Sequence, residues 1–207
     1  AGVAFGFPQA SNAAMNPAVP DSTPIAPNGQ PFEPSMWYWI DAEGQAQDID
    51  LDPFLDRLEA EYCIDTDRVF ATGHSWGGDM AQVVACYLGD RFTASAPVAA
   101  NRPYWFEPSV TCLGDTAVWT LFGIADSHFT NQAYPGQYGD ECRDFWLDER
   151  GCDAPTSYVD LEWGEAEECV EYTGCDAPVR YCLYGAAAGH GVPGYYSEAV
   201  VDWFRSF

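Results

Sequence analysis

Lysine is absent from this sequence, so its eight arginines are its only strongly basic side chains. They stand against 32 acidic residues, which gives the 207-residue chain a formal net charge of −24 at pH 7. Nucleic acids are held by clusters of Lys and Arg, so a surface of this sign repels them. We therefore expect no nucleic-acid partner. A saline habitat is one interpretation of the acidic excess.

Long hydrophobic runs are also missing. No apolar stretch approaches the ~18 residues of a membrane-spanning helix, so no membrane partner is expected. Hydrophobic residues nevertheless make up 47% of the chain and aromatic residues 15%, which is enough for a substantial core. The length suits one domain over residues 1–207.

The eight cysteines include no pair at C-x-x-C spacing, which argues against a zinc knuckle or a thioredoxin motif. An even number of cysteines in an acidic chain is typical of disulfides formed in an oxidising compartment, so we expect a secreted, extracellular protein. The alternative is a set of buried free thiols. Residues 152–182 are rich in cysteine and resemble a disulfide-stapled insertion before the last strand.

Strand-like and helix-like segments alternate along the chain. The pattern predicts strands over 2–8, 68–73, 94–100, 117–126, 157–163 and 179–185, and helices over 48–63, 78–90, 138–151 and 195–207. Such alternation indicates an α/β fold, with a mostly parallel sheet covered by helices on both faces.

One segment, VFATGHSWGGDMAQVVAC (69–86), indicates catalysis. Residues 73–77 fit G-x-S-x-G between a predicted strand and a predicted helix, which is the setting of a nucleophile elbow. Glycines there relieve crowding in a sharp turn, and Ser75 falls at a helix N-terminus whose N–H groups can stabilise an oxyanion. The alternative is a glycine-rich turn with a capping serine.

A serine nucleophile needs a base and an acid to orient it. Of the three histidines, His74 adjoins the serine, and we expect its side chain to point away from the attack line. His190 lies on a loop of small residues after a predicted strand and is the favoured base. Asp126 lies at the carboxyl end of another predicted strand and is the favoured acid. His128 is the rival base.

These residues resemble a known family. The segments RVFATGHSWGGDMAQVVACYLGDRFTASAPVAA, LFGIADSHF and PVRYCLYGAAAGHGVPG are similar to the nucleophile, acid and histidine regions of secreted feruloyl esterases and poly(3-hydroxybutyrate) depolymerases. These are hydrolases of the α/β-hydrolase fold. The resemblance implies Ser75 as nucleophile, Asp126 as acid, His190 as base and the Trp76 N–H as an oxyanion donor, with no metal or cofactor.

The resemblance also implies a serine carboxylesterase whose partner is an ester substrate. Feruloyl esters of plant cell-wall polysaccharide are the favoured substrate. A polyester depolymerase is the alternative, and a non-catalytic fragment or binding module is the alternative from another class. We expect Trp39, His74 and Trp76 to bind substrate. Relative to the family, we expect the first strands to be missing, together with the loop that supplies a second oxyanion donor.

Two disulfides follow from the resemblance, Cys152–Cys182 and Cys169–Cys175. Eight cysteines allow 105 pairings, so the sequence alone does not choose among them. The partners of Cys63, Cys86, Cys112 and Cys142 stay open.

Overall fold

The computed structural model describes residues 51–103, 112–127, 137–161 and 166–207. The predicted strand 2–8, Trp39 and His128 lie outside these residues. Residues 57–207 form one compact unit, and the first 56 residues are grouped separately. The expectation of one domain over the whole chain stays a prediction.

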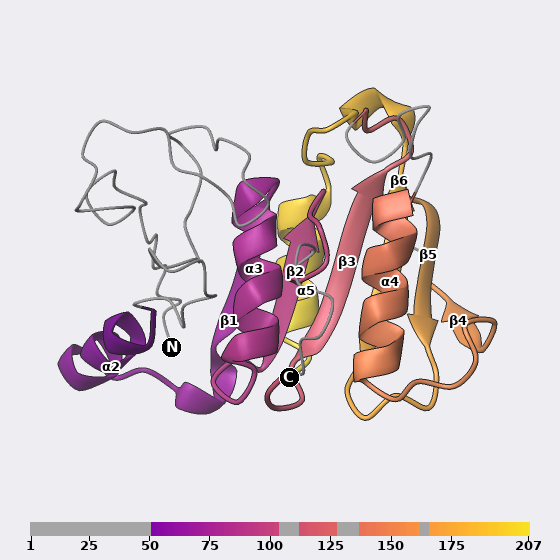
Figure 1. Ribbon diagram of the computed structural model, residues 1–207. Coiled ribbons are helices and arrows are strands. Elements are labelled where there is room, and N and C mark those ends of the chain that lie inside the picture. The colour runs from indigo at the N-terminus through magenta and orange to yellow at the C-terminus, as the bar shows by residue number, and fades with distance from the viewer. Residues whose placement is uncertain (1–50, 104–111, 128–136, 162–165) are drawn as a thin grey trace, which may run out of the picture. The chain divides into compact units, whose positions relative to one another are not determined.

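Within these described residues, six strands form a single sheet in the order β1-β2-β3-β6-β5-β4 (Figure 1). The parallel strands are β1 (Phe70–His74), β2 (Ala94–Val98), β3 (Ala117–Gly123) and β6 (Val179–Tyr184). Antiparallel pairing adds β5 (Ala166–Tyr172) and β4 (Tyr158–Asp160). The helices are α2 (Leu51–Glu61), α3 (Trp76–Tyr87), α4 (Gln137–Glu149) and α5 (Tyr196–Phe204), with short 3-10 turns η1 (Thr66–Arg68) and η2 (Ala186–Ala188).

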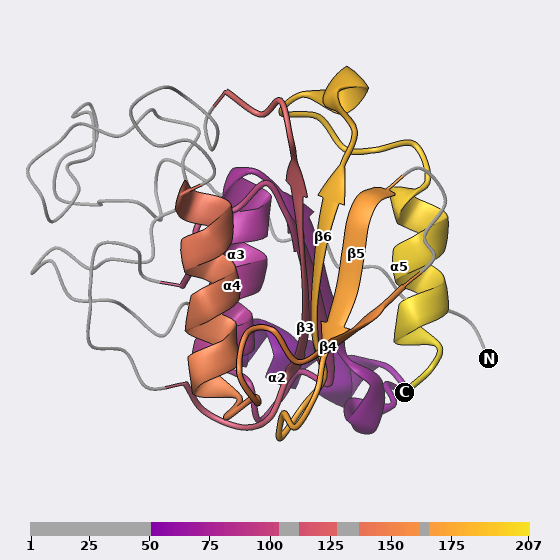
Figure 2. The ribbon, with the colours of Figure 1, turned by 90° about the vertical axis from the view of Figure 1, so that its right-hand side faces the viewer.

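Helices cover both faces of the parallel strands. Figure 2 shows α3 and α4 on one face and α5 on the other. Every residue of β2 and β3 is buried, which explains why these strands appear in the sequence as continuous apolar runs. On the α5 side, Trp119 meets Trp203 edge to face, with ring centroids 5.5 Å apart. The predicted α/β architecture is confirmed.

Strand β5 is the element that hydrophobic pattern alone does not predict. Its sequence AEECVEY contains three glutamates, and it becomes a strand because it pairs with β6 in register. Glu171 there accepts a 2.5 Å hydrogen bond from Arg180 on β6. Residues 152–182 are therefore no insertion before the last strand, because they contain β4, β5 and most of β6 itself.

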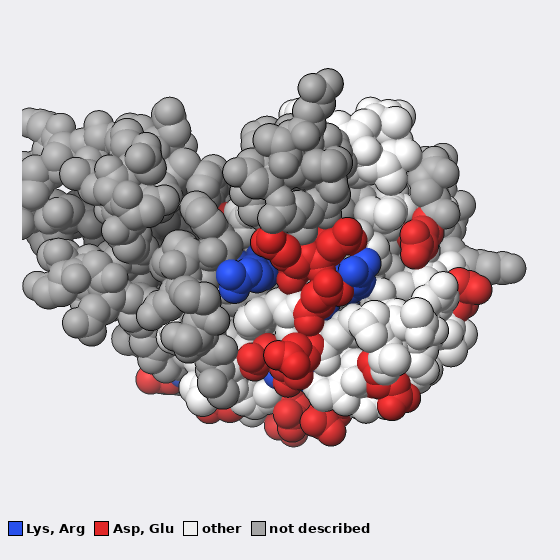
Figure 3. Space-filling view, turned by 45° about the vertical axis from the view of Figure 1, so that its right-hand side comes forward, with Lys and Arg blue, Asp and Glu red and all other residues white. Residues whose placement is uncertain are grey.

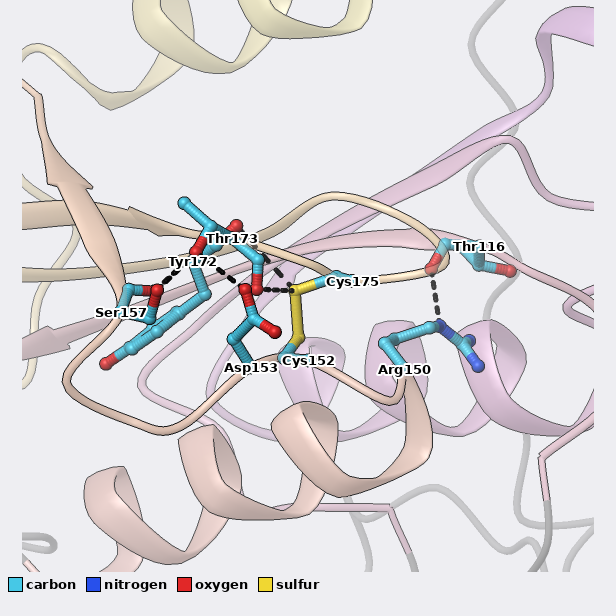
Figure 4. The surroundings of a disulfide bond; sticks show 8 residues. All are labelled: Thr116, Arg150, Cys152, Asp153, Ser157, Tyr172, Thr173 and Cys175. Carbon is cyan, nitrogen blue, oxygen red and sulfur yellow. Dashed lines mark hydrogen bonds between the residues drawn. A yellow bond between two sulfur atoms is a disulfide. The ribbon is translucent and has the colours of Figure 1, made fainter.

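The predicted pairings Cys152–Cys182 and Cys169–Cys175 are wrong. Cys169 and Cys182 lie directly opposite each other in the antiparallel register of β5 and β6, with Cα atoms 4.0 Å apart, and they bond to each other. Cys152 follows α4 and bonds to Cys175 in the turn between β5 and β6 (Figure 4).

Strand register thus decides the Cys169–Cys182 bond. In the same region Asp153 donates its N–H to the Thr173 carbonyl, 2.9 Å away. The third disulfide is Cys86–Cys112. Cys63 is an exposed free thiol and Cys142 a buried one, so the disulfide and free-thiol interpretations each hold for some of the cysteines.

Among the charged side chains on the face that Figure 3 shows, acidic ones predominate and few are basic. Arg143 forms ion pairs with Asp140, at 2.9 Å, and with Asp144, at 2.8 Å. Within the described residues, the helices are all too short or too polar to span a membrane.

Candidate active site

The three predicted catalytic residues follow the carboxyl ends of parallel strands. Ser75 comes directly after β1, Asp126 follows β3 by three residues, and His190 lies on the loop after β6. Because β1, β2, β3 and β6 are parallel, these ends lie along one edge of the sheet, the upper edge in Figure 1. Ligands of open α/β sheets bind at this edge.

The turn at Ser75 is tight. Ser75 has φ 55° and ψ −124°, a conformation that few non-glycine residues adopt. A Cβ at Gly73 would overlap the backbone of Gly77, and a Cβ at Gly78 would lie 2.8 Å from the Val98 carbonyl oxygen. A Cβ at Gly77 would meet no atom within 4 Å in the described part of the chain. The close approach therefore requires glycine at 73 and 78, while the second glycine of the motif has space.

A chain of hydrogen bonds joins the three side chains. His190 Nε2 lies 3.0 Å from Ser75 Oγ, and His190 Nδ1 lies 2.7 Å from Asp126 Oδ2. Asp126 is fully buried, and an ionised carboxylate only accepts hydrogen bonds. Nδ1 therefore carries the proton and donates to Asp126, which leaves Nε2 to accept from the Ser75 hydroxyl. This arrangement can remove a proton from Ser75.

The N–H of Trp76 is the first of helix α3 and adjoins Ser75. The first N–H groups of a helix have no acceptor within the helix, so they are available to a negatively charged oxygen. The Trp76 side chain and Trp39 lie outside the described structure, and their expected role in substrate binding stays a prediction. In the residues that the structure describes, His, Cys, Asp and Glu side chains form no group that could hold a metal ion.

Asp79 is a polar residue of this region that sequence analysis missed. It lies one turn after Ser75 on α3 and is buried; its N–H donates to the Ser75 carbonyl at 2.8 Å. Its carboxylate accepts the backbone N–H of Asn101, at 2.7 Å, just beyond β2. Burial raises the pKa of Asp79 from its usual 3.8 to about 7, against the opposing effect of the hydrogen bonds from Asn101. The available signal was an acidic residue in an apolar helical run.

Substituting Asp79→Asn is expected to change how stability depends on pH. The unfolded chain releases the Asp79 proton near pH 3.8 and the folded chain near pH 7. In that window the folded state binds more protons, so the free energy of unfolding falls as pH rises. Asparagine does not titrate. We therefore expect the unfolding free energy of the variant, minus that of wild type, to increase by on the order of a few kcal/mol between pH 4 and pH 8.

Urea unfolding of both proteins at pH 4, 6 and 8 measures this shift. All other titrating groups are shared, so their contributions cancel in the difference between the two proteins. A difference that stays constant from pH 4 to pH 8 would show that the Asp79 carboxyl titrates alike in the folded and unfolded states.

Comparison with known proteins gives two kinds of relative. A probable feruloyl esterase C of Aspergillus niger is 26% identical over 174 residues, covering 82% of this chain and 57% of that protein. Poly(3-hydroxyalkanoate) depolymerase C of Paucimonas lemoignei is 35% identical over 68 residues, covering 33% of this chain and 16% of that protein. No protein-family model matches the chain.

The chain spans 57% of the length of the Aspergillus niger relative, so it corresponds to little more than half of such a protein. Among solved structures, an acetyl xylan esterase from Aspergillus awamori is similar, with a TM-score of 0.61, 16% identity, and coverage of 85% of this chain and 75% of that one. At this identity the likeness shows the fold. Together with the strand–turn–helix around Ser75, these comparisons show that the chain has the α/β-hydrolase fold and is similar in sequence to feruloyl esterases and to a poly(3-hydroxyalkanoate) depolymerase.

Proposed function

We propose that this protein is an extracellular serine carboxylesterase. The observation that carries the proposal is the hydrogen-bonded series Asp126–His190–Ser75 at the carboxyl edge of the parallel strands. The three disulfides agree with an oxidising, extracellular compartment.

The geometry supports a two-step reaction. Ser75 Oγ attacks the ester carbonyl carbon while His190 Nε2 takes the hydroxyl proton. The tetrahedral oxyanion accepts the N–H of Trp76. His190 then gives its proton to the leaving alcohol as the carbon–oxygen bond breaks, leaving an acyl group on Ser75. Water attacks this acyl-enzyme with His190 as base again, which releases the acid and regenerates the serine. Asp126 stabilises the imidazolium in both steps.

Feruloyl esters are the proposed substrate class. The similarity to a protein named feruloyl esterase C extends over 174 residues, whereas the similarity to a polyhydroxyalkanoate depolymerase extends over 68. A polyester depolymerase is the second candidate because its proposed chemistry at Ser75 is the same and its local identity is higher, at 35%. The two candidates differ in the acyl group that the site must hold.

A direct comparison of substrates tests the proposal. The purified protein is incubated with methyl ferulate and, in parallel, with methyl 3-hydroxybutyrate and a 3-hydroxybutyrate oligomer. We expect kcat/KM for methyl ferulate to exceed that for both aliphatic esters by at least about tenfold, because an aromatic acyl group buries more apolar area in the site. The Ser75→Ala variant serves as the blank.

The reverse preference would replace the feruloyl assignment with the depolymerase. A folded sample that hydrolyses no ester, and whose Ser75 is not labelled by a fluorophosphonate, would contradict the esterase altogether and favour a non-catalytic module.

A further inference from the structure

His74 is the last residue of β1 and directly precedes Ser75. Its side chain reaches the loop that carries His190, where its Nε2 makes a short hydrogen bond to the His190 main-chain oxygen. The two imidazole rings lie 5.0 Å apart, centroid to centroid. A carbonyl oxygen only accepts hydrogen bonds, so His74 Nε2 carries a proton and donates it.

A second side chain holds the next carbonyl of the same loop. Tyr184, at the end of β6, is fully buried, and its hydroxyl donates to the Gly191 oxygen at 3.0 Å. Burial raises the pKa of Tyr184, so the hydroxyl keeps its proton and remains a donor. Two consecutive carbonyls, those of His190 and Gly191, are therefore bonded to side chains from two different strands of the sheet.

The loop needs such support because its own side chains supply little. Five of the residues nearest His190 are alanine or glycine: Ala186, Ala187, Ala188, Gly189 and Gly191. Small side chains bury little apolar area, so packing fixes the loop weakly. Its backbone comes close to the sheet instead, because a Cβ at Gly123 would overlap the Gly189 carbonyl. Main-chain hydrogen bonds then decide where the His190 ring lies.

We propose that His74 is a positioning residue for the base, and that its imidazole, with the Tyr184 hydroxyl, fixes the main chain of His190 so that Nε2 stays within hydrogen-bonding distance of Ser75 Oγ. The proposal rests on the proposed serine esterase function. In this proposal His74 binds the main chain of His190, whereas the sequence suggested that it contacts the substrate. Proton transfer depends steeply on such a distance, so a small displacement of His190 lowers kcat.

Three variants test the proposal. His74→Leu removes the donor while keeping apolar bulk, His74→Gln keeps an amide N–H donor, and Tyr184→Phe removes only a hydroxyl. We expect His74→Leu to lower kcat for methyl ferulate about 10–100-fold with KM within about twofold of wild type. His74→Gln is expected to recover most of that loss, and Tyr184→Phe to lower kcat by a smaller factor in the same direction.

Thr72→Val is the matched control. Thr72 lies two residues earlier on β1. Its hydroxyl is hydrogen-bonded to the Ala96 carbonyl, at 2.9 Å, and to the Tyr196 hydroxyl, and both partners lie outside residues 185–194. This variant also loses a side-chain hydrogen bond to a backbone oxygen, so it reports the general cost of such a loss. We expect its kcat to stay within about twofold of wild type.

Hydrogen–deuterium exchange gives a readout that needs no activity. Amides of residues 185–194 are expected to exchange faster in His74→Leu than in wild type, and at the wild-type rate in Thr72→Val. Unchanged kcat and exchange in His74→Leu would overturn the proposal, and so would a raised KM at constant kcat, because that pattern indicates substrate contact. A failure of the proposed serine esterase function would be seen in a different result: the Ser75→Ala variant would hydrolyse the ester as fast as wild type.

Discussion

The His190→Ala variant is expected to lose about 10⁴-fold or more in kcat for ester hydrolysis, and Ser75→Ala/His190→Ala is expected to lose little beyond that. His190 Nε2 lies 3.0 Å from Ser75 Oγ, and with the ring gone no base removes the serine proton. Because serine and base act as one unit, deleting the second residue after the first removes nothing further. Steady-state kinetics of the two single variants and the double variant measure this non-additivity.

The Asp126→Asn variant keeps the base, His190, but changes the hydrogen bond that orients its imidazole. The amide keeps the shape of Asp126, but its NH₂ group would face the Nδ1–H of His190, 2.7 Å away in wild type. The favourable tautomer then reverses and Nε2 becomes a donor, so we expect a loss of similar size, about 10⁴-fold. Binding of substrate should change little, which leaves KM near its wild-type value.

His128→Ala is the control for the rival base. We expect it to keep kcat within about twofold of wild type, because His190 already contacts both Ser75 and Asp126. Activity that survives His190→Ala and disappears in His128→Ala would reverse the assignment.

The order of the predicted strands and helices was enough to predict the fold class and the position of the candidate site. Ser75 and His190 follow predicted strands, and Asp126 ends one. Because parallel strands end at one edge of a sheet, the pattern predicted that these residues lie close together. The three side chains are indeed hydrogen-bonded in the structure.

The sequence did not predict contacts that depend on strand register or loop geometry. Cys169 pairs with Cys182 because two antiparallel strands align at that residue, and no local pattern encodes that alignment. The contact between His74 and the His190 carbonyl joins residues 116 positions apart. The carboxylate of Asp79, on helix α3, likewise accepts a hydrogen bond from Asn101, just beyond β2. In each case the contact joins residues that are not neighbours in the sequence.

The glycines of the elbow show the same dependence on three-dimensional contact, and they give the second large prediction. Gly73→Ala is expected to lower the melting temperature by about 10 °C or more, or to prevent folding, which corresponds to several kcal/mol. A Cβ at this position would overlap the carbonyl of Gly77 and lie 2.9 Å from the N of Gly78. These obstacles are backbone atoms at the start of α3, so no side-chain rotation relieves them, and the helix must move away from β1.

Gly77→Ala is the matched control in the same five-residue motif. No atom of the described chain lies within 4 Å of the added Cβ, and alanine is favoured over glycine inside a helix. We expect its melting temperature to stay within about 3 °C of wild type. Thermal unfolding followed by circular dichroism compares the two variants. Equal melting temperatures would contradict the close packing of β1 against α3. A large loss in Gly73→Ala alone would mean that the first glycine of the motif shapes the elbow, because, of the two glycines of G-x-S-x-G, only Gly73 lacks room for a Cβ.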